Sequence, residues 1–272
     1  MKMLEKNIKP KWHISYGIIY IHMFVLVFIA HIFLKQKMYI FPELVFWIET
    51  VLVTMLLMLM IISMFRKTAS TVWWEVMLIL IAFAGVWIYF LSFLPLSLAI
   101  ILASILTILA FVWQMTYSMN LFYVVGCSGI GLLTIWYFTP SIIIFLTLGV
   151  LLYDYFRMRE IKMATLYYDA RRLGLIPGFL LPVDFLGWIN SRARVWNPGL
   201  GKIASILPFM MSASISFQLL LNYSEMTFLF FCILVMLFGL AYGLTKNYEL
   251  RSNVFLGTAI LVFIIISLVD KI

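Results

Sequence analysis

The chain consists largely of apolar runs that are each long enough to cross a lipid bilayer, and charged residues separate these runs. A membrane-spanning helix needs about 20 predominantly apolar residues. The runs explain a composition that is 65% hydrophobic, 17% aromatic and only 11% charged, with a mean hydropathy of +1.11. Soluble domains have far fewer apolar residues. We therefore expect an all-α, multi-pass integral membrane protein, which would lie in the cell membrane if the source is microbial.

Nine segments of the chain meet this length requirement, with boundaries defined to a few residues. They are 14–34, 44–65, 73–93, 95–114, 119–137, 140–156, 199–221, 226–244 and 253–269. The first run follows several lysines, as in a signal peptide, but its length favours a retained helix. We expect one transmembrane domain over 1–272, with a six-helix part (1–156), a basic loop (157–198) and a three-helix part (199–272).

The basic residues support this count, because Lys and Arg accumulate in cytoplasmic loops. With the amino end in the cytoplasm, the cytoplasmic side receives Lys2, Lys6, Lys9, Lys11, Arg66, Lys67, Arg157, Arg159, Lys162, Arg171, Arg172, Arg192, Arg194, Lys246 and Arg251. The outer side receives Lys35, Lys37 and Lys271. The carboxyl end is therefore predicted to lie outside. The net charge of +8 reflects orientation signals and contacts with membrane lipids, so we expect no nucleic acid partner.

The connection 157–198 is much longer than the other loops, and loops of that length are usually functional or disordered. Within it, 179–189 is apolar but too short to span and is interrupted by Pro182, which favours an interfacial or re-entrant piece. The stretch 161–173 is compatible with an amphipathic helix on the membrane surface. The alternative is a loop that only binds lipid headgroups.

Two ionisable residues stand at the ends of apolar runs, where charge is expensive and usually marks function or pairing. Asp154 lies near the inner end of the sixth segment, and Lys202 lies in the expected first turn of the seventh. The two side chains therefore share a depth and could form an ion pair. Alternatively, Lys202 extends to the headgroups and Asp154 is hydrated. A third intramembrane acid, Glu49, is better explained as a helix-packing contact.

These residues carry a resemblance to a known family. Tyr153-Asp154 in a sixth helix, a long basic loop, and Gly199-Leu200-Gly201 opening a seventh helix resemble the presenilin and signal peptide peptidase family. Members are nine-helix intramembrane aspartyl proteases with a YD pair in the sixth helix and a GxGD motif in the seventh. The compact chain is most similar to microbial homologues. The resemblance implies that Asp154 is a catalytic position, with Tyr153, Gly199 and Gly201 as accessory residues.

The chain departs from that family at two places, both at the implied site. Lys202 stands where the second catalytic aspartate would be, and 250–256 lacks the Pro-Ala-Leu motif that precedes the ninth helix. Aspartyl proteolysis needs two carboxyl groups that share a proton. A cation beside Asp154 would keep it ionised. The resemblance therefore implies a pseudoprotease that retains the fold and binds transmembrane helices of other membrane proteins.

Two alternatives remain open. Asp184, in the apolar part of the loop, could fold back and supply the second acid for an active protease. Asp154, Lys202 and Glu49 could instead line the path of a transporter or channel. The absence of an internal repeat in the sequence argues against a transporter.

The sequence indicates neither a cofactor nor a metal site. His13, His22 and His31 follow one another at equal spacing, so on a helix successive rings face opposite sides and lie about 13 Å apart along the axis. Cys127 and Cys232 fall inside apolar runs, where thiols act as small packing groups.

Overall fold

The computed structural model describes residues 12–36, 71–138, 142–144, 146–149, 178–182, 188, 201–204, 206–244, 257, 261 and 264. This part of the chain is mostly helical, as the composition predicts. The elements are α1 (Trp12–Gln36), α3 (Thr71–Leu91), α4 (Leu96–Ile108), η1 (Leu109–Trp113), α5 (Thr116–Tyr137), β1 (Phe179–Pro182), β2 (Gly201–Ala204), α9 (Leu207–Asn222) and α10 (Glu225–Leu244).

Three of the described helical stretches are long and apolar enough to cross a membrane: Ile14–Phe33, Leu96–Trp113 and Thr116–Ile135. Two shorter apolar stretches, Ile79–Leu91 and Glu225–Leu237, belong to α3 and α10. The three longer stretches match the thickness of a bilayer. The described part of the chain therefore has the character of a membrane protein.

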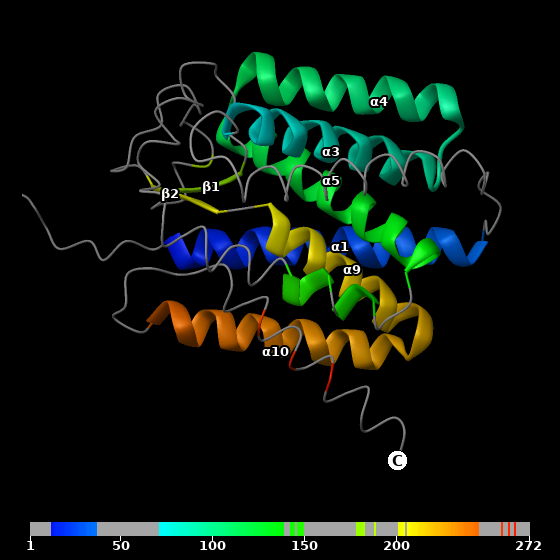
Figure 1. Cartoon of the computed structure of the whole chain (residues 1–272), viewed down its shortest axis with the longest axis vertical. Helices are drawn as coiled ribbons and strands as arrows, with labels where there is room; N and C mark the ends of the chain where they lie inside the picture. Colours follow the sequence, from blue (N-terminus) through cyan, green and yellow to red (C-terminus); the bar gives the residue numbers. More distant parts are fainter. Residues whose placement is uncertain are drawn as a thin grey trace, which may run out of the picture.

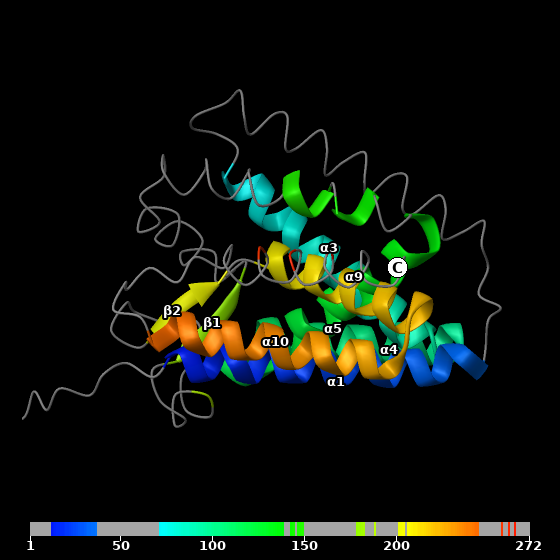
Figure 2. The same ribbon diagram turned by 90° about the horizontal axis from the view of Figure 1, so that it is seen from below.

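The described helices lie side by side and run in two opposite directions. Figure 1 shows α1, α3, α5 and α9 beginning at the same end of the bundle, whereas α4 and α10 run the other way. The view turned by 90° shows α1 and α10 side by side (Figure 2). Phe24 packs against Phe231 and Phe228, and Phe28 packs against Phe228, so the contacts move backwards along α10 as α1 advances. We call the end where α1, α3, α5 and α9 begin the amino-terminal end of the bundle.

A proline ends the connection between α3 and α4. Pro95 has an extended backbone with φ −65° and ψ 154°, and α4 starts at the next residue. Proline has no N–H to donate, so it fits the position just before a helix but not its interior. The predicted division of the apolar run near Pro95 is confirmed. The second proposed division, near Pro140, lies outside the described residues.

The far end of α4 changes its winding. The last turn, η1, is a π-helix, and the chain then turns at Gln114, which has φ 52° and ψ 30°. A non-glycine residue in the left-handed region is uncommon and suits a sharp reversal. The turn lets α5 begin at Thr116 and run back beside α3.

The helix α5 lies at the centre of the bundle and packs closely against α3 and α9. A Cβ added at Gly126 would lie 2.6 Å from the Ala82 carbonyl oxygen of α3, and one added at Gly131 would lie 2.8 Å from Ala213 of α9. Small residues let helix backbones approach closely in membranes, where lipid tails provide no hydrophobic driving force between helices. These glycines therefore fix the spacing of the three helices.

Candidate functional site

A two-stranded antiparallel sheet lies at the amino-terminal end of the bundle, where α9 begins (Figure 1). Its register pairs Phe179 with Ala204, Leu180 with Ile203, Leu181 with Lys202, and Pro182 with Gly201. The sheet brings the apolar part of the long loop to the segment that carries the predicted Gly201 and Lys202. We call β1, β2 and the side chains that hold them the sheet site.

The position of Lys202 corrects the sequence-based prediction. Lys202 was expected in the first turn of a helix over 199–221, but it belongs to strand β2, and α9 begins only at Leu207. Pro208 stands at the first turn of α9. Proline has no N–H to donate to a preceding turn, so it suits the first turn of a helix and not its interior. Gly201 and Lys202, the last two residues of the Gly199-Leu200-Gly201-Lys202 (GxGK) segment, therefore lie in a strand.

Strand β1 is buried in the bundle. Phe179, Leu180 and Leu181 are 0%, 0% and 2% exposed. The Phe179 ring packs 4.3 Å from the Phe209 ring of α9 and 5.9 Å from that of Tyr123 of α5. The apolar segment 179–189 was predicted to be interfacial or re-entrant, and its described strand is packed into the bundle core.

Asn120 of α5 holds the middle of β1 through two hydrogen bonds. Its Nδ2 donates to the Leu180 carbonyl oxygen at 2.7 Å, and its Oδ1 accepts from the Leu180 N–H at 2.8 Å. The Asn120 side chain is only 2% exposed. A primary amide offers one donor and one acceptor side by side, so it can replace a neighbouring strand at one residue. Asn120 therefore closes the edge of β1 that faces away from β2.

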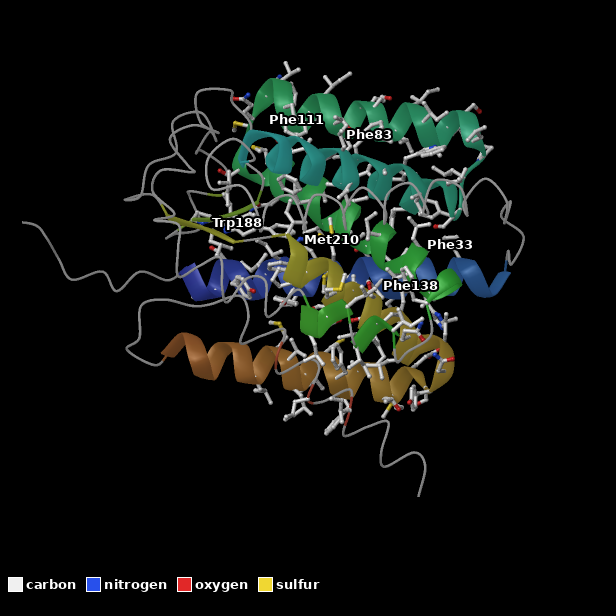
Figure 3. The ribbon with its side chains drawn as sticks, in the orientation of Figure 1. Phe33, Phe83, Phe111, Phe138, Trp188 and Met210 are labelled. Atoms are coloured by element: carbon white, nitrogen blue, oxygen red, sulfur yellow. The ribbon has the colours of Figure 1, made fainter. Side chains whose placement is uncertain are left out.

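Ser15 of α1 holds the end of the same strand. Its Oγ donates to the Pro182 carbonyl oxygen at 2.7 Å and accepts a hydrogen bond of 3.0 Å from Trp188 Nε1. Ser15 and Trp188 are both buried. Figure 3 shows Trp188 at the amino-terminal end of the bundle, far from Phe33 and Phe138. One hydroxyl thus links α1, the end of β1 and the loop that follows it.

The hydrogen bonds from Asn120 and Ser15 show which backbone groups of β1 point away from β2. In an antiparallel pair, the residues that exchange hydrogen bonds alternate with residues whose polar groups point outwards. The backbone N–H and carbonyl of Leu180 point away from β2, towards Asn120. Its neighbours Phe179 and Leu181 are therefore the residues that exchange backbone hydrogen bonds with Ala204 and Lys202. Pro182 points outwards like Leu180, and it has no N–H to satisfy. On β1 the outer edge is therefore fully occupied by Asn120 and Ser15.

The same alternation assigns the outer edge of β2. Because Lys202 and Ala204 pair with β1, the backbone groups of Gly201 and Ile203 point to the opposite side. The two-stranded sheet has no further strand among the described residues. Among the described residues, β1 is the strand that pairs with β2, and the outward-pointing backbone groups of Gly201 and Ile203 form the other edge of β2.

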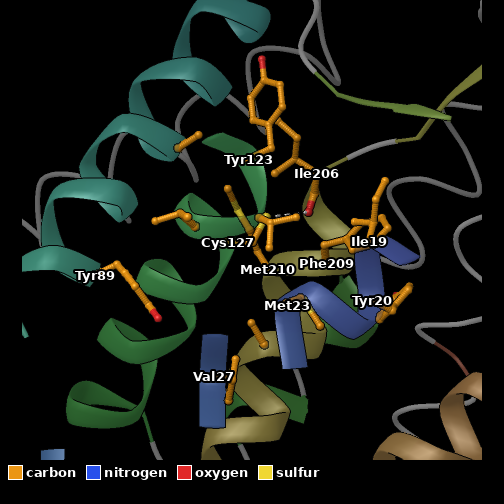
Figure 4. Packing of buried hydrophobic residues seen from close by; sticks show 14 of the residues in the cluster. Ile19, Tyr20, Met23, Val27, Tyr89, Tyr123, Cys127, Ile206, Phe209 and Met210 are labelled. Carbon is orange, nitrogen blue, oxygen red and sulfur yellow. Dashed lines mark hydrogen bonds between the residues drawn. The ribbon is translucent and has the colours of Figure 1, made fainter. Parts of the chain in front are cut away.

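An aromatic and polar layer under the sheet connects α1 with α9 (Figure 4). The Tyr20 ring stacks on the Phe209 ring at 4.5 Å, and the Tyr20 hydroxyl lies 3.3 Å from the Ser212 hydroxyl. Cys127 Sγ of α5 donates to the Ile206 carbonyl oxygen at 3.8 Å. Cys127 is fully buried, which agrees with the packing role expected for it.

The serine hydroxyl groups along α9 donate hydrogen bonds to carbonyl oxygens of the same helix. Ser212, Ser214 and Ser216 each donate to the carbonyl oxygen of the residue four positions earlier, at 2.9, 2.9 and 2.7 Å. All three are fully buried. Such bonds are ordinary for serine in membrane helices. They give no sign of a nucleophile held by a base, so these serines have a structural role.

Several predicted site residues lie outside the described residues, so their mutual geometry stays a prediction. This applies to Tyr153, Asp154, Gly199, Asp184 and Glu49. Of the predicted site, the structure describes the backbone of Gly201 and Lys202. Among the described residues, no group of three His, Cys, Asp or Glu side chains lies close enough to hold a metal ion.

Ser15, Asn120 and Trp188, which hold the sheet, were not among the predicted site residues. Asn120 carried a usable signal, because an amide inside an apolar helix usually faces another part of the protein. Ser15 and Trp188 carried none, since serine and tryptophan are common near the ends of membrane helices.

Comparison with known proteins found no matching family model, no matching curated protein and no matching solved structure.

Proposed function

We propose that the chain is a presenilin-like homologue of the intramembrane aspartyl proteases, that it does not hydrolyse peptide bonds, and that it binds transmembrane helices of other membrane proteins. The proposal rests on the resemblance of Tyr153-Asp154 and the GxGK segment to the family motifs. The observation that carries it is the strand that contains Lys202. Residue 202 belongs to an ordered ladder directly before α9, and it is a base instead of the acid that hydrolysis requires.

The outer edge of β2, which pairs with no strand among the described residues, supports a binding role. Extended peptides commonly bind by adding a strand to a sheet edge, where main-chain hydrogen bonds provide the affinity. On β1 that edge is occupied by Asn120 and Ser15, which leaves Gly201 and Ile203 of β2 as the pairing positions. A partner would unwind the end of its transmembrane helix and pair there as an extended segment.

The proposal includes nine spans, with the amino end in the cytoplasm and the carboxyl end outside. Successive crossings alternate in direction, so two helices that run the same way need an odd number of crossings between them. The pair α1 and α3 and the pair α5 and α9 each run the same way (Figure 1). The predicted segments 44–65 and 140–156 supply one crossing for each pair. Labelling of single cysteines placed at the two ends, from either side of a sealed vesicle, tests this topology.

A reconstitution assay tests the loss of hydrolysis. The purified chain is placed in liposomes with transmembrane peptides, and products are followed by mass spectrometry. We expect intact peptides with the wild-type chain, because one carboxylate cannot both activate water and protonate the leaving group. Cleavage by the wild-type chain that disappears in Asp154→Ala would contradict the proposal. Cleavage that also disappears in Asp184→Asn would identify Asp184 as the second acid.

The same liposomes test the alternative function as a transporter or channel. We expect no flux of protons or ions beyond that of protein-free liposomes. Flux that is lost in Asp154→Asn would favour transport over helix binding.

A further inference from the structure

The turn between η1 and α5 joins two helical stretches that are each long and apolar enough to cross a membrane. The stretch Leu96–Trp113 ends at this turn, and Thr116–Ile135 begins there. Gln114 is left-handed and Met115 is extended, with φ −74° and ψ 143°, so two successive residues leave helical geometry. Irregular backbone that faces lipid does not occur within hydrocarbon. The turn is therefore expected at a surface of the bilayer.

The exposed aromatic side chains that carry a polar atom are gathered at this turn. Within the described part of the chain, the exposed aromatic residues are Phe33, Trp113, Tyr117 and Phe230. Trp113 ends η1 and is 66% exposed, whereas Tyr117 lies in the first turn of α5 and is 51% exposed. These two carry an indole N–H and a phenol hydroxyl, and a phenylalanine ring has neither. Indole and phenol rings are enriched where hydrocarbon meets the headgroups, because one end of the ring is apolar and the other is polar.

The sheet site lies at the same end of the bundle and at nearly the same level. Asn120, which holds the middle of β1, follows Tyr117 by three residues, or about 5 Å along the axis of α5. Ser15, which holds the end of β1, is the second residue of the stretch Ile14–Phe33. Figure 1 shows the sheet at the end of the bundle where α4 finishes and α5 begins. Two separate helices thus place β1 near the end of a membrane-spanning stretch.

We propose that Trp113 and Tyr117 bind the interfacial layer of a phospholipid bilayer and thereby hold the sheet site at the boundary between headgroups and hydrocarbon. The rings lie against the acyl chains, and the indole N–H and the phenol hydroxyl donate to ester or phosphate oxygens of the lipid. The position of both residues at the ends of spanning stretches favours lipid as the partner. The proposal does not depend on whether the chain binds helices of other proteins.

Fluorescence quenching by brominated phospholipids tests the depth of Trp113. The full chain is reconstituted in phosphatidylcholine vesicles whose acyl chains carry bromine either close to the headgroup or close to the bilayer centre. The difference in emission between the wild type and Trp113→Phe isolates Trp113 among the nine tryptophans. We expect the shallow bromine to quench this emission at least about twofold more than the deep bromine, because half of the hydrocarbon core is about 15 Å thick.

Ile101→Trp is the matched control for depth. Ile101 is 51% exposed on the same helical stretch, twelve residues before Trp113, which is about 18 Å along the axis. The added tryptophan should therefore lie near the bilayer centre, and the deep bromine should quench it more strongly. If it shows the same preference as Trp113, α4 lies along the membrane surface instead of across the bilayer, and the proposal is wrong.

A second experiment tests whether the two rings set the level of the sheet site. Ile108→Trp, at a position that is 57% exposed, adds a depth reporter five residues before Trp113. Replacing Trp113 and Tyr117 by Leu in this chain lengthens the apolar stretch by one or two residues. The reporter should then sink by about 2–3 Å, so its quenching by the deep bromine should rise. Phe230→Leu removes an exposed ring without a polar atom and should change nothing.

Three results would overturn the proposal. Quenching of Trp113 by neither lipid means that protein covers the ring. Stronger quenching by the deep bromine places the turn within the hydrocarbon. An unchanged depth of the reporter after both rings are replaced by Leu means that the rings do not hold the level of the sheet site. None of these results bears on peptide binding or hydrolysis, so they leave the proposed function to its own tests.

Discussion

Asn120 and Leu180 are joined by a pair of hydrogen bonds, in which the side-chain amide of a central helix replaces the neighbour that an edge strand lacks. The two distances are 2.7 and 2.8 Å, and both residues are buried. A buried backbone N–H or carbonyl without a hydrogen-bond partner is costly. The Asn120 amide therefore allows β1 to be buried in the core without that cost. Sixty positions of sequence separate the two residues, so the contact also fixes the long loop against α5.

Replacing Asn120 by Leu should destabilise the protein by about 2 kcal/mol. The change keeps the branched shape of the side chain but leaves the N–H and the carbonyl of Leu180 without partners, at about 1–3 kcal/mol each in a soluble core and less in a membrane. The free energy of unfolding is measured by titration with a denaturing detergent. Ser118→Ala is the control, because Ser118 Oγ bonds only the nearby Met115 carbonyl. Equal losses in both variants would contradict a specific role for Asn120.

A second prediction concerns the close approach of α3 and α5. Gly126→Ala places a methyl group 2.6 Å from the Ala82 carbonyl oxygen, and backbone atoms cannot move aside as a flexible side chain can. We expect a loss of about 3 kcal/mol in the free energy of unfolding, which is the upper end of the range that is typical of overpacking in a tight core.

Gly149→Ala is the matched control for that substitution. A Cβ at Gly149 meets no atom within 4 Å, and alanine is the better helix former by about 1 kcal/mol. The control should therefore be neutral or slightly stabilising. A Gly126→Ala protein as stable as the control would show that α3 and α5 can separate without loss.

The third prediction separates the two hydrogen bonds of Ser15. Ser15→Ala removes the bond to the Pro182 carbonyl and leaves Trp188 Nε1 without an acceptor, so we expect a loss of about 1–2 kcal/mol. Trp188→Phe removes only the second bond and should cost less. Unfolding of both variants and of the double variant forms a cycle. If Ser15→Ala and Trp188→Phe cost the same and their effects add fully, the link through one hydroxyl is wrong.

The helices could be predicted because length and apolar composition almost determine them in a membrane. The runs 14–34, 73–93 and 226–244 correspond to α1, α3 and α10 within a few residues. In hydrocarbon a helix provides hydrogen-bond partners for its backbone groups within one segment. An apolar run of sufficient length therefore has few conformations other than a helix. The same reasoning found the break at Pro95.

The strand β2 could not be predicted from apolar composition, because a short strand and a helical turn have the same hydropathy. Residues 201–204 continue into the apolar run of α9, and only Pro208 indicated that the helix starts later. Pairing with β1 decides the conformation, and β1 lies about 20 residues earlier, across a loop. Strand pairing of this kind depends on tertiary contacts more than on local preference.

The contacts that hold the sheet could not be predicted from the sequence either. Ser15 and Pro182 are separated by 167 positions, and Ser15 and Trp188 by 173. No local pattern connects residues so far apart. The candidate site could therefore be predicted as a chain segment, namely the GxGK stretch, but not as an arrangement of side chains.

The last prediction tests partner binding at the edge of β2. Ile203→Pro removes an N–H that points away from β1, and proline favours an extended residue before it, so the ladder from Lys202 to Leu181 should persist. We expect the variant to fold with a free energy of unfolding within about 1 kcal/mol of the wild type, since no bond to β1 is lost. Its binding of a transmembrane peptide that unwinds at its cytoplasmic end should fall at least about fivefold, because one main-chain hydrogen bond is worth about 1 kcal/mol and the ring also obstructs the edge.

Lys202→Pro provides the contrast, since it removes an N–H that pairs with Leu181 and should destabilise the sheet itself. Ile203→Val keeps the N–H and should bind as the wild type does. The measurement is peptide affinity in liposomes by energy transfer, with unfolding followed in parallel. Undiminished binding by a stable Ile203→Pro protein would mean that the partner does not extend the sheet, and the strand edge would then have only a structural role.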